Sequence, residues 1–118
     1  MLYYGDVGGS LKAFLITNAK LSTKPVSQTA TAFVFPGASP AVSASGASNG
    51  IVWACENTDP AVLHAYDASN LAHELYNSNQ AAGGRDHFGT GNKFITPTIA
   101  DGTVLVGTTN GVAVFGLR

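Results

Sequence analysis

The sequence predicts an all-β fold of antiparallel sheets, and three observations support this prediction. Charged residues make up only 11% of the 118 residues and 14 residues are glycine, which is typical of a compact protein with many turns. Apolar residues make up 45%, which is enough to form a core rather than a disordered chain. Finally, short apolar runs alternate with clusters of Asn, Asp, Pro and Gly, which indicates strands joined by tight turns.

The expected strands fall into three units along the chain. The first unit has strands at 2–6 and 10–17 and a third strand near 20–27. The second unit has four strands, at 39–44, 50–56, 62–67 and 71–78. The third unit has three strands, at 94–100, 103–108 and 111–117. Pro40 and Pro97 lie near the start of a unit's first strand, where a missing backbone donor is tolerated.

The three units resemble one another at a period of about 50 residues. Each has a bulky residue followed by a small one, at Tyr4-Gly5, Trp53-Ala54 and Val106-Gly107. In each, the next strand ends in an aromatic residue, at Phe14, Tyr66 and Phe115. This period, with four antiparallel strands per unit, is typical of the blades of a β-propeller. A β-sandwich with incidental internal similarity is the alternative.

Residues 62–88 and 93–117 resemble the C-terminal blades of bacterial quinoprotein-like propellers, which carry pyrroloquinoline-quinone-type repeats. Ala65 and Asp67 match the first two positions of the repeat A-x-D-x-x-T-G-x-x-x-W. The other positions depart from the pattern, since Asn70 and Leu71 replace Thr-Gly and Leu75 or Tyr76 replaces Trp. The resemblance therefore concerns architecture more than chemistry.

The resemblance implies a partial β-propeller of about two and a half to three blades within a single domain, 1–118. Blade one is expected to be partial at 1–36, blade two complete at 37–79 and blade three partial at 93–118. Uncovered blade faces expose more apolar surface than a monomer usually tolerates. We therefore expect homo-oligomerisation that completes a ring, with a dimer of three-bladed chains favoured over a trimer.

The resemblance also bears on cofactors and location. Family members that oxidise alcohols or sugars hold a quinone and a calcium ion with side chains from several blades. None of those ligands maps onto this chain, so neither quinone nor calcium is expected in it. The family implies a periplasmic or secreted parent, although the start of this chain has no signal-peptide pattern.

Charge and the cysteine and histidine content limit which partners, disulfides and metal sites are expected. The net charge of −1 gives no electrostatic reason to expect nucleic acid or an anionic membrane as a partner. The single cysteine, Cys55, cannot form an internal disulfide and is expected to be a buried thiol. The histidine spacings match no zinc motif, so no metal site is expected. His64 is predicted to be packed, at a blade interface or elsewhere, and His73 to be exposed.

The long loop at 79–92 contains the densest group of reactive side chains, Arg85, Asp86 and His87. In a propeller this loop and the turns that carry Asp6, Glu56 and Asp59 lie at one end, around the mouth of the central channel. We expect those three carboxylates to bind a ligand, and Glu56 and Asp59 could pair as acid and base if buried. A salt bridge and turn in the loop, and a solvated turn at 56–59, are the structural alternatives.

Two functions from different classes follow. The first is a scaffold or binding module that self-assembles into a ring and holds a small molecule at the channel mouth. The alternative is a hydrolase of esters or phosphoesters that uses the 83–91 loop. There His87 would act as base while Asp86 and Arg85 would supply charge stabilisation. Quinone-dependent oxidation is a third and weaker hypothesis.

Overall fold

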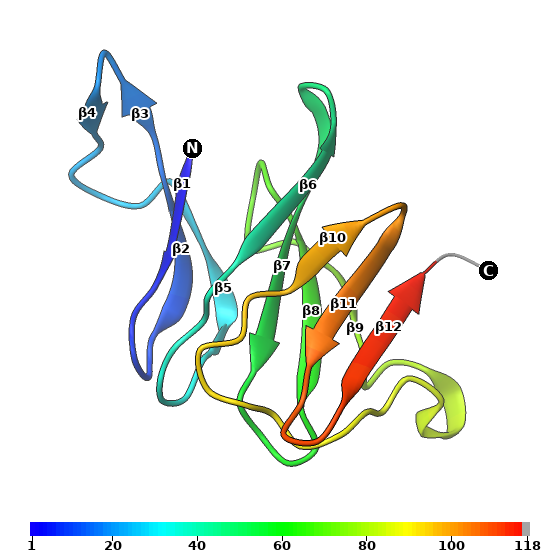
Figure 1. Ribbon diagram of the computed structural model, residues 1–118. Coiled ribbons are helices and arrows are strands. Elements are labelled where there is room, and N and C mark those ends of the chain that lie inside the picture. The colour runs from blue at the N-terminus through cyan, green and yellow to red at the C-terminus, as the bar shows by residue number, and fades with distance from the viewer. Residues whose placement is uncertain (117–118) are drawn as a thin grey trace.

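A computed structural model describes residues 1–116, whose strands form four antiparallel sheets, none of them closed (Figure 1). The helical content of these residues is a single 3-10 turn, η1 (Ala82–Gly84). The all-β prediction is therefore confirmed. Within the described residues, no helix is long and apolar enough to cross a membrane.

The N-terminal sheet has the order β1-β2-β5. Its strands are β1 (Leu2–Gly5), β2 (Ser10–Phe14) and β5 (Ser27–Ala32). Between β2 and β5 the chain forms a small separate hairpin of β3 (Ile16–Thr17) and β4 (Lys20–Leu21).

The hairpin corrects two predictions for the first unit. The strand expected at 10–17 ends at Phe14, and the strand expected near 20–27 lies instead at 27–32. The cause is the turn between β3 and β4, where Asn18 and Ala19 both have positive φ angles, of 50° and 61°. Two consecutive residues of this kind reverse an extended chain tightly. The sequence Asn-Ala hides this turn because Ala rarely adopts a positive φ.

The middle sheet is a four-stranded antiparallel meander in sequence order. Its strands are β6 (Ala41–Ser45), β7 (Ser48–Glu56), β8 (Val62–Asp67) and β9 (Glu74–Asn77). Strand β8 is buried from Val62 to Tyr66, so neighbouring sheets cover both of its faces. The strands predicted at 50–56 and 62–67 match β7 and β8 closely.

The C-terminal sheet has three strands, β10 (Thr98–Ala100), β11 (Thr103–Gly107) and β12 (Val112–Gly116). The first strand expected here, at 94–100, begins only at Thr98. Phe94 has a φ of 61°, which breaks an extended conformation, and Pro97 has no backbone donor for a ladder. Residue 117, the predicted end of the last strand, lies outside the described residues.

The three larger sheets lie side by side, with the middle sheet between the other two (Figure 1). Successive residues of a strand point to opposite faces, so β8 contributes to two apolar clusters. The cluster toward the N-terminal sheet contains Leu11, Ala13, Phe33, Ala38, Val52, Ala54, Tyr66 and Leu71. The cluster toward the C-terminal sheet has the buried core Leu63, Val104 and Val106.

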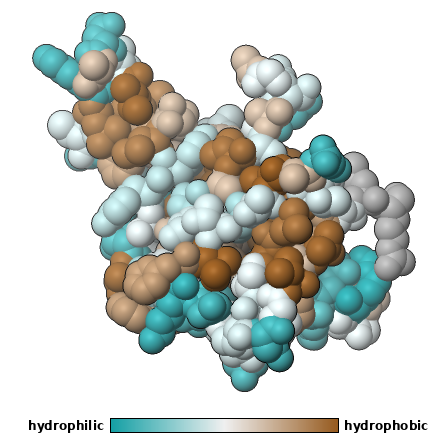
Figure 2. Space-filling model, viewed as in Figure 1, coloured by the Kyte–Doolittle hydropathy of each residue, from teal (hydrophilic) through white to brown (hydrophobic). Residues whose placement is uncertain are grey.

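The outer faces of the two flanking sheets carry exposed apolar side chains. Leu2 and Tyr4 are exposed on β1, while Val112 and Val114, on β12, are each 64% exposed. Apolar patches are interspersed with polar ones on the face of the molecule in Figure 2. Burial is therefore concentrated around the middle sheet, and the flanking sheets are buried mainly on one side.

Candidate functional site

A cleft of about 980 Å³ lies between parts of the middle sheet and the C-terminal sheet, beside the buried cluster of Leu63, Val104 and Val106. We call it the inter-sheet cleft. One wall is formed by Ile51, Trp53 and Tyr76 of the middle sheet, and the other by Thr103, Val104, Ala113 and Phe115. The loop segment 85–88 lines it as well. Gly102, Ala113 and Gly116 also line the cleft and occupy little of its space, because they have a small side chain or none.

The loop segment beside the cleft is held by an ion pair. The Nε and Nη2 atoms of Arg85 donate to the two carboxylate oxygens of Asp86 at 2.7 and 3.0 Å. The hydroxyl of Tyr76, on β9, donates to Oδ2 of Asp86 at 2.7 Å. Burial and this hydrogen bond raise the pKa of Tyr76 to about 12. The salt bridge that the sequence suggested as the structural alternative is therefore present.

Glycines shape the backbone of this loop. Gly83 and Gly84 have φ angles of 66° and 68°, which favour glycine because it lacks a Cβ atom. The amide of His87 then donates to the carbonyl of Gly84 at 3.0 Å. His87 itself is exposed at the cleft, and Phe88 packs edge-on against Phe115 with ring centroids 5.1 Å apart.

The structure thus brings Arg85, Asp86 and His87 to one cleft. Asp86 holds Arg85 and accepts from Tyr76, so the carboxylate and the guanidinium orient each other. The segment is held by Tyr76 on β9, which is the last strand of the middle sheet and lies at the opposite edge from β6 (Figure 1).

The three carboxylates predicted to bind a ligand each have a different partner. Asp6 pairs with the ammonium group of Lys12, and this hydrogen bond lowers the pKa of Asp6. Asp59 accepts a hydrogen bond from the hydroxyl of Thr90 at 2.9 Å. The turns of Asp6 and Asp59 lie at the same end of the molecule in Figure 1.

Glu56 differs from both alternatives that the sequence offered. Its Oε1 atom lies 2.7 Å from Nε2 of His64, so it neither pairs with Asp59 nor lies in a solvated turn. On the other side of the ring, Oε1 of Glu74 lies 2.6 Å from Nδ1 of His64. We call these three residues the His64 cluster.

The His64 cluster is the ionisable site that sequence reasoning missed. His64 is only 4% exposed, which confirms the prediction that it is packed, and its ring faces Phe33 and stacks on Tyr66. Burial lowers the pKa of His64, but the hydrogen bonds and charges of the two glutamates more than offset this, so the pKa is raised. With a carboxylate at each ring nitrogen, the imidazolium is the form that donates to both.

Strand register is the signal that could have revealed this cluster. Ala54 lies opposite His64 in the β7–β8 ladder, and Glu74 lies opposite Tyr66 in the β8–β9 ladder. Same-face neighbours two positions away along adjacent strands are within reach of long side chains. Among the described residues, no group of three His, Cys, Asp or Glu side chains is arranged to hold a metal ion.

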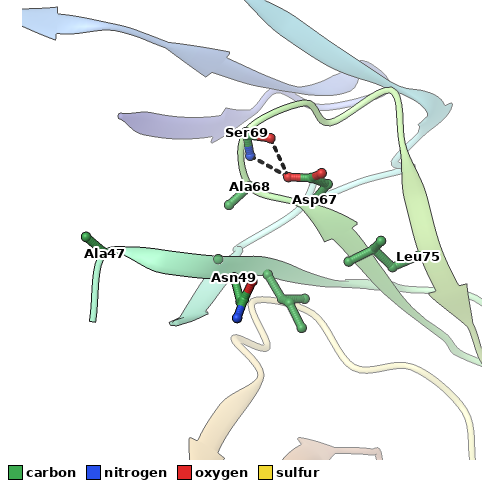
Figure 3. A pocket seen from close by; sticks show the side chains of 8 residues that line it. Ala47, Asn49, Asp67, Ala68, Ser69 and Leu75 are labelled. Carbon is green, nitrogen blue, oxygen red and sulfur yellow. Dashed lines mark hydrogen bonds between the residues drawn. The ribbon is translucent and has the colours of Figure 1, made fainter. Parts of the chain in front are cut away.

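A second hollow, of about 580 Å³, lies beside the β6–β7 and β8–β9 turns of the middle sheet (Figure 3). Its lining includes Asn49, Asp67, Ser69 and Leu75. Asp67 accepts hydrogen bonds from the amide and the hydroxyl of Ser69 at 2.8 and 2.6 Å, which lowers the pKa of Asp67. The main polar group of this hollow therefore stabilises its own turn.

Comparisons with protein-family models, curated proteins and solved structures find no match for the chain. The choice of a functional site therefore depends on geometry. The inter-sheet cleft combines a large volume, aromatic walls and an oriented guanidinium group. These are features of small-molecule sites, which are mostly apolar with a few well-placed polar groups.

Proposed function

We propose that the chain is a small-molecule-binding module and that the inter-sheet cleft holds the ligand. The observation that carries this proposal is the cleft itself, whose volume of about 980 Å³ lies at the upper end of the range of ligand pockets. Trp53, Phe88 and Phe115 offer apolar contact area, and the polar side chains of 85–87 are grouped together. The proposed site lies between two sheets rather than at a channel mouth.

The scaffold that we propose for this site is a propeller fragment of about three blades. Two observations support it. The sheets are meanders that lie side by side, and β6 and β10, the first strands of neighbouring sheets, are in contact. The internal period of about 50 residues fits the same interpretation.

Binding can be tested with naphthalene-2-carboxamide, a flat neutral compound, by following amide and indole shifts in ¹H–¹⁵N NMR spectra. The chain has one tryptophan, so the indole N–H signal belongs to Trp53. We expect saturable shifts at Trp53, Ala113 and Phe115. Ala113→Leu should weaken binding because the added side chain occupies the cleft. Val112→Leu is the matched control, because Val112 is on the opposite face of β12.

Two outcomes would contradict the proposal. One is a set of shifts confined to the exposed outer faces. The other is an affinity that Ala113→Leu and Val112→Leu change equally, since only Ala113 lines the cleft.

A second candidate function is self-assembly, which the exposed outer faces favour. Leu2 and Tyr4 lie on one flanking sheet, and Val112 and Val114 on the other. A second copy that packs its N-terminal sheet on the C-terminal sheet of the first would cover both sets. Head-to-tail contacts form a ring where they close, and a closed dimer would contain six of the larger sheets. Each apolar Å² covered contributes about 25 cal/mol.

Gel filtration with light scattering tests this assembly at micromolar concentration. We expect a dimer, and we expect Val114→Lys to yield monomers because it places a charge in the contact. Thr109→Lys adds the same charge in the β11–β12 turn and should leave the dimer intact. A monomeric wild-type chain would overturn the assembly without affecting the cleft.

Hydrolysis of esters or phosphoesters by the 83–91 loop stays a prediction, as does quinone-dependent oxidation. The geometry adds no argument for hydrolysis, because within residues 1–116 the hydrogen bonds of Arg85 go to Asp86 rather than to His87.

A further inference from the structure

We infer that the ligand of the inter-sheet cleft is a planar aromatic carboxylate, with its ring between the two sheets and its carboxylate on Arg85. This inference rests on the proposed function and names the ligand class of the same site. Three observations carry it, namely the end edge of the guanidinium group, which forms no hydrogen bond with residues 1–116, the support of that group by its neighbours, and the aromatic lining of the cleft.

The stereochemistry of the Arg85–Asp86 pair leaves one edge of the guanidinium group for a ligand. A guanidinium has five N–H donors in a rigid plane. Asp86 accepts from Nε and Nη2, which form the side edge of that plane. The end edge, formed by Nη1 and the second hydrogen of Nη2, has the same fork geometry and suits a second carboxylate.

The neighbours of Arg85 keep this edge in place. Asp86 is fixed by the hydroxyl of Tyr76, which projects from β9, so the order Tyr76–Asp86–Arg85 runs from a strand to an exposed cation. The side chain of Arg85 is 63% exposed and that of Asp86 only 19%. An incoming anion therefore meets the cation first, and the guanidinium loses little freedom on binding.

The cleft itself selects a flat apolar group. Its two walls belong to neighbouring β-sheets, whose side chains meet at the buried cluster of Leu63, Val104 and Val106. The indole N–H of Trp53 already donates to Ser43 at 2.9 Å, so Trp53 offers the ligand its ring rather than its donor. Phe115 and Val104 line the opposite wall. Aromatic rings pack well against such walls in offset or edge-to-face arrangements.

Calorimetric titration with naphthalene-2-carboxylate and with naphthalene-2-carboxamide tests the inference, since the two compounds have nearly the same shape and differ in charge. We expect the carboxylate to bind about tenfold more tightly, because a hydrogen bond to a charged partner contributes that much or more. Arg85→Gln should reduce this preference to about one and leave the affinity for the amide unchanged. Lys24→Gln, which removes the same charge from an exposed site, should preserve the preference.

The possible outcomes test the ligand class and the proposed function separately. Equal affinities of the wild type for both compounds, or a preference that survives Arg85→Gln, would overturn the carboxylate assignment while the cleft remained a binding site. Failure of both compounds to bind would overturn the cleft as their site. Arg85→Lys gives a sharper check, because it keeps the charge but loses the fork, so the preference should fall below that of the wild type.

Discussion

The middle sheet packs against its two neighbours in different ways. Toward the N-terminal sheet the interface is closed, and Leu11, Phe33 and Val52 are completely buried there. Toward the C-terminal sheet the buried core is smaller, and aromatic residues such as Trp53 and Phe115 remain partly exposed around the cleft. The comparison suggests that one side of the sheet supplies stability and the other supplies a site.

The distribution of charge matches this difference. The closed interface contains the His64 cluster, in which a buried ring is compensated by two carboxylates. A buried ionisable group persists only when it is paired, because desolvation of a lone charge is costly. At the open interface the charged pair of Arg85 and Asp86 lies at the cleft, where the side chain of Arg85 is exposed.

The largest expected effect is the loss of Phe33 from the closed interface. Phe33→Ala should lower the free energy of unfolding by about 4 kcal/mol, because it leaves a cavity among fully buried neighbours. Phe115→Ala, at the open interface, should cost only about 1–2 kcal/mol, since Phe115 is half-buried and water can enter. Urea denaturation followed by circular dichroism measures both.

Phe33→Leu keeps this comparison measurable if Phe33→Ala does not fold. It should cost about 1–2 kcal/mol because most of the volume is retained. Equal costs for the alanine variants at positions 33 and 115 would show that the two interfaces are energetically alike, contrary to the comparison.

Much of the strand pattern could be predicted from the sequence, whereas the sites could be predicted only in part. Strands β7 and β8 follow from short apolar runs, 51–55 and 62–66, between clear turn signals. The turn at Asn18-Ala19 could not be foreseen, because its geometry depends on a positive φ at Ala19. The partner of Glu56 depended on strand register, which local composition does not specify.

The loop at 79–92 could also be predicted only in part. Its glycines and its Arg-Asp-His run indicated a functional segment, and the structure does bring these side chains to a cleft. Their partner Tyr76 lies ten positions before Asp86, on β9. No local spacing rule connects the two, so the support of Arg85 became visible only in three dimensions.

A smaller effect is expected from pH, through the His64 cluster. The folded-state pKa of His64 is raised above its ordinary value of about 6.5. Its contribution is therefore fully present below about pH 6.5 and is lost as the pH rises through the folded-state pKa. His64→Gln should cost about 2 kcal/mol at pH 6, because hydrogen bonds to charged groups are lost. The cost should shrink at higher pH.

Denaturation curves between pH 6 and pH 10 test this dependence. His73→Gln is the matched control, because His73 is exposed and lies outside the closed interface. The variant at position 73 should follow the wild type, while His64→Gln should show a flatter profile above pH 6.5. Parallel profiles for the wild type and His64→Gln would mean that the cluster does not couple proton binding to folding.

The smallest single effect is that of Ala113→Leu, and it gives the most direct test of the comparison when the same substitution is made at both interfaces. Ala113→Leu places three added carbons in the open cleft, and we expect a gain of about 0.5–1 kcal/mol in the free energy of unfolding because apolar surface is covered. Ala54→Leu adds the same atoms at a fully buried position of the closed interface and should cost about 1–3 kcal/mol through overpacking. The opposite signs follow because only the cleft has room for the added volume. If Ala113→Leu were as destabilising as Ala54→Leu, the cleft would have to be closed in solution, and neither a ligand nor the difference between the two interfaces could be attributed to it.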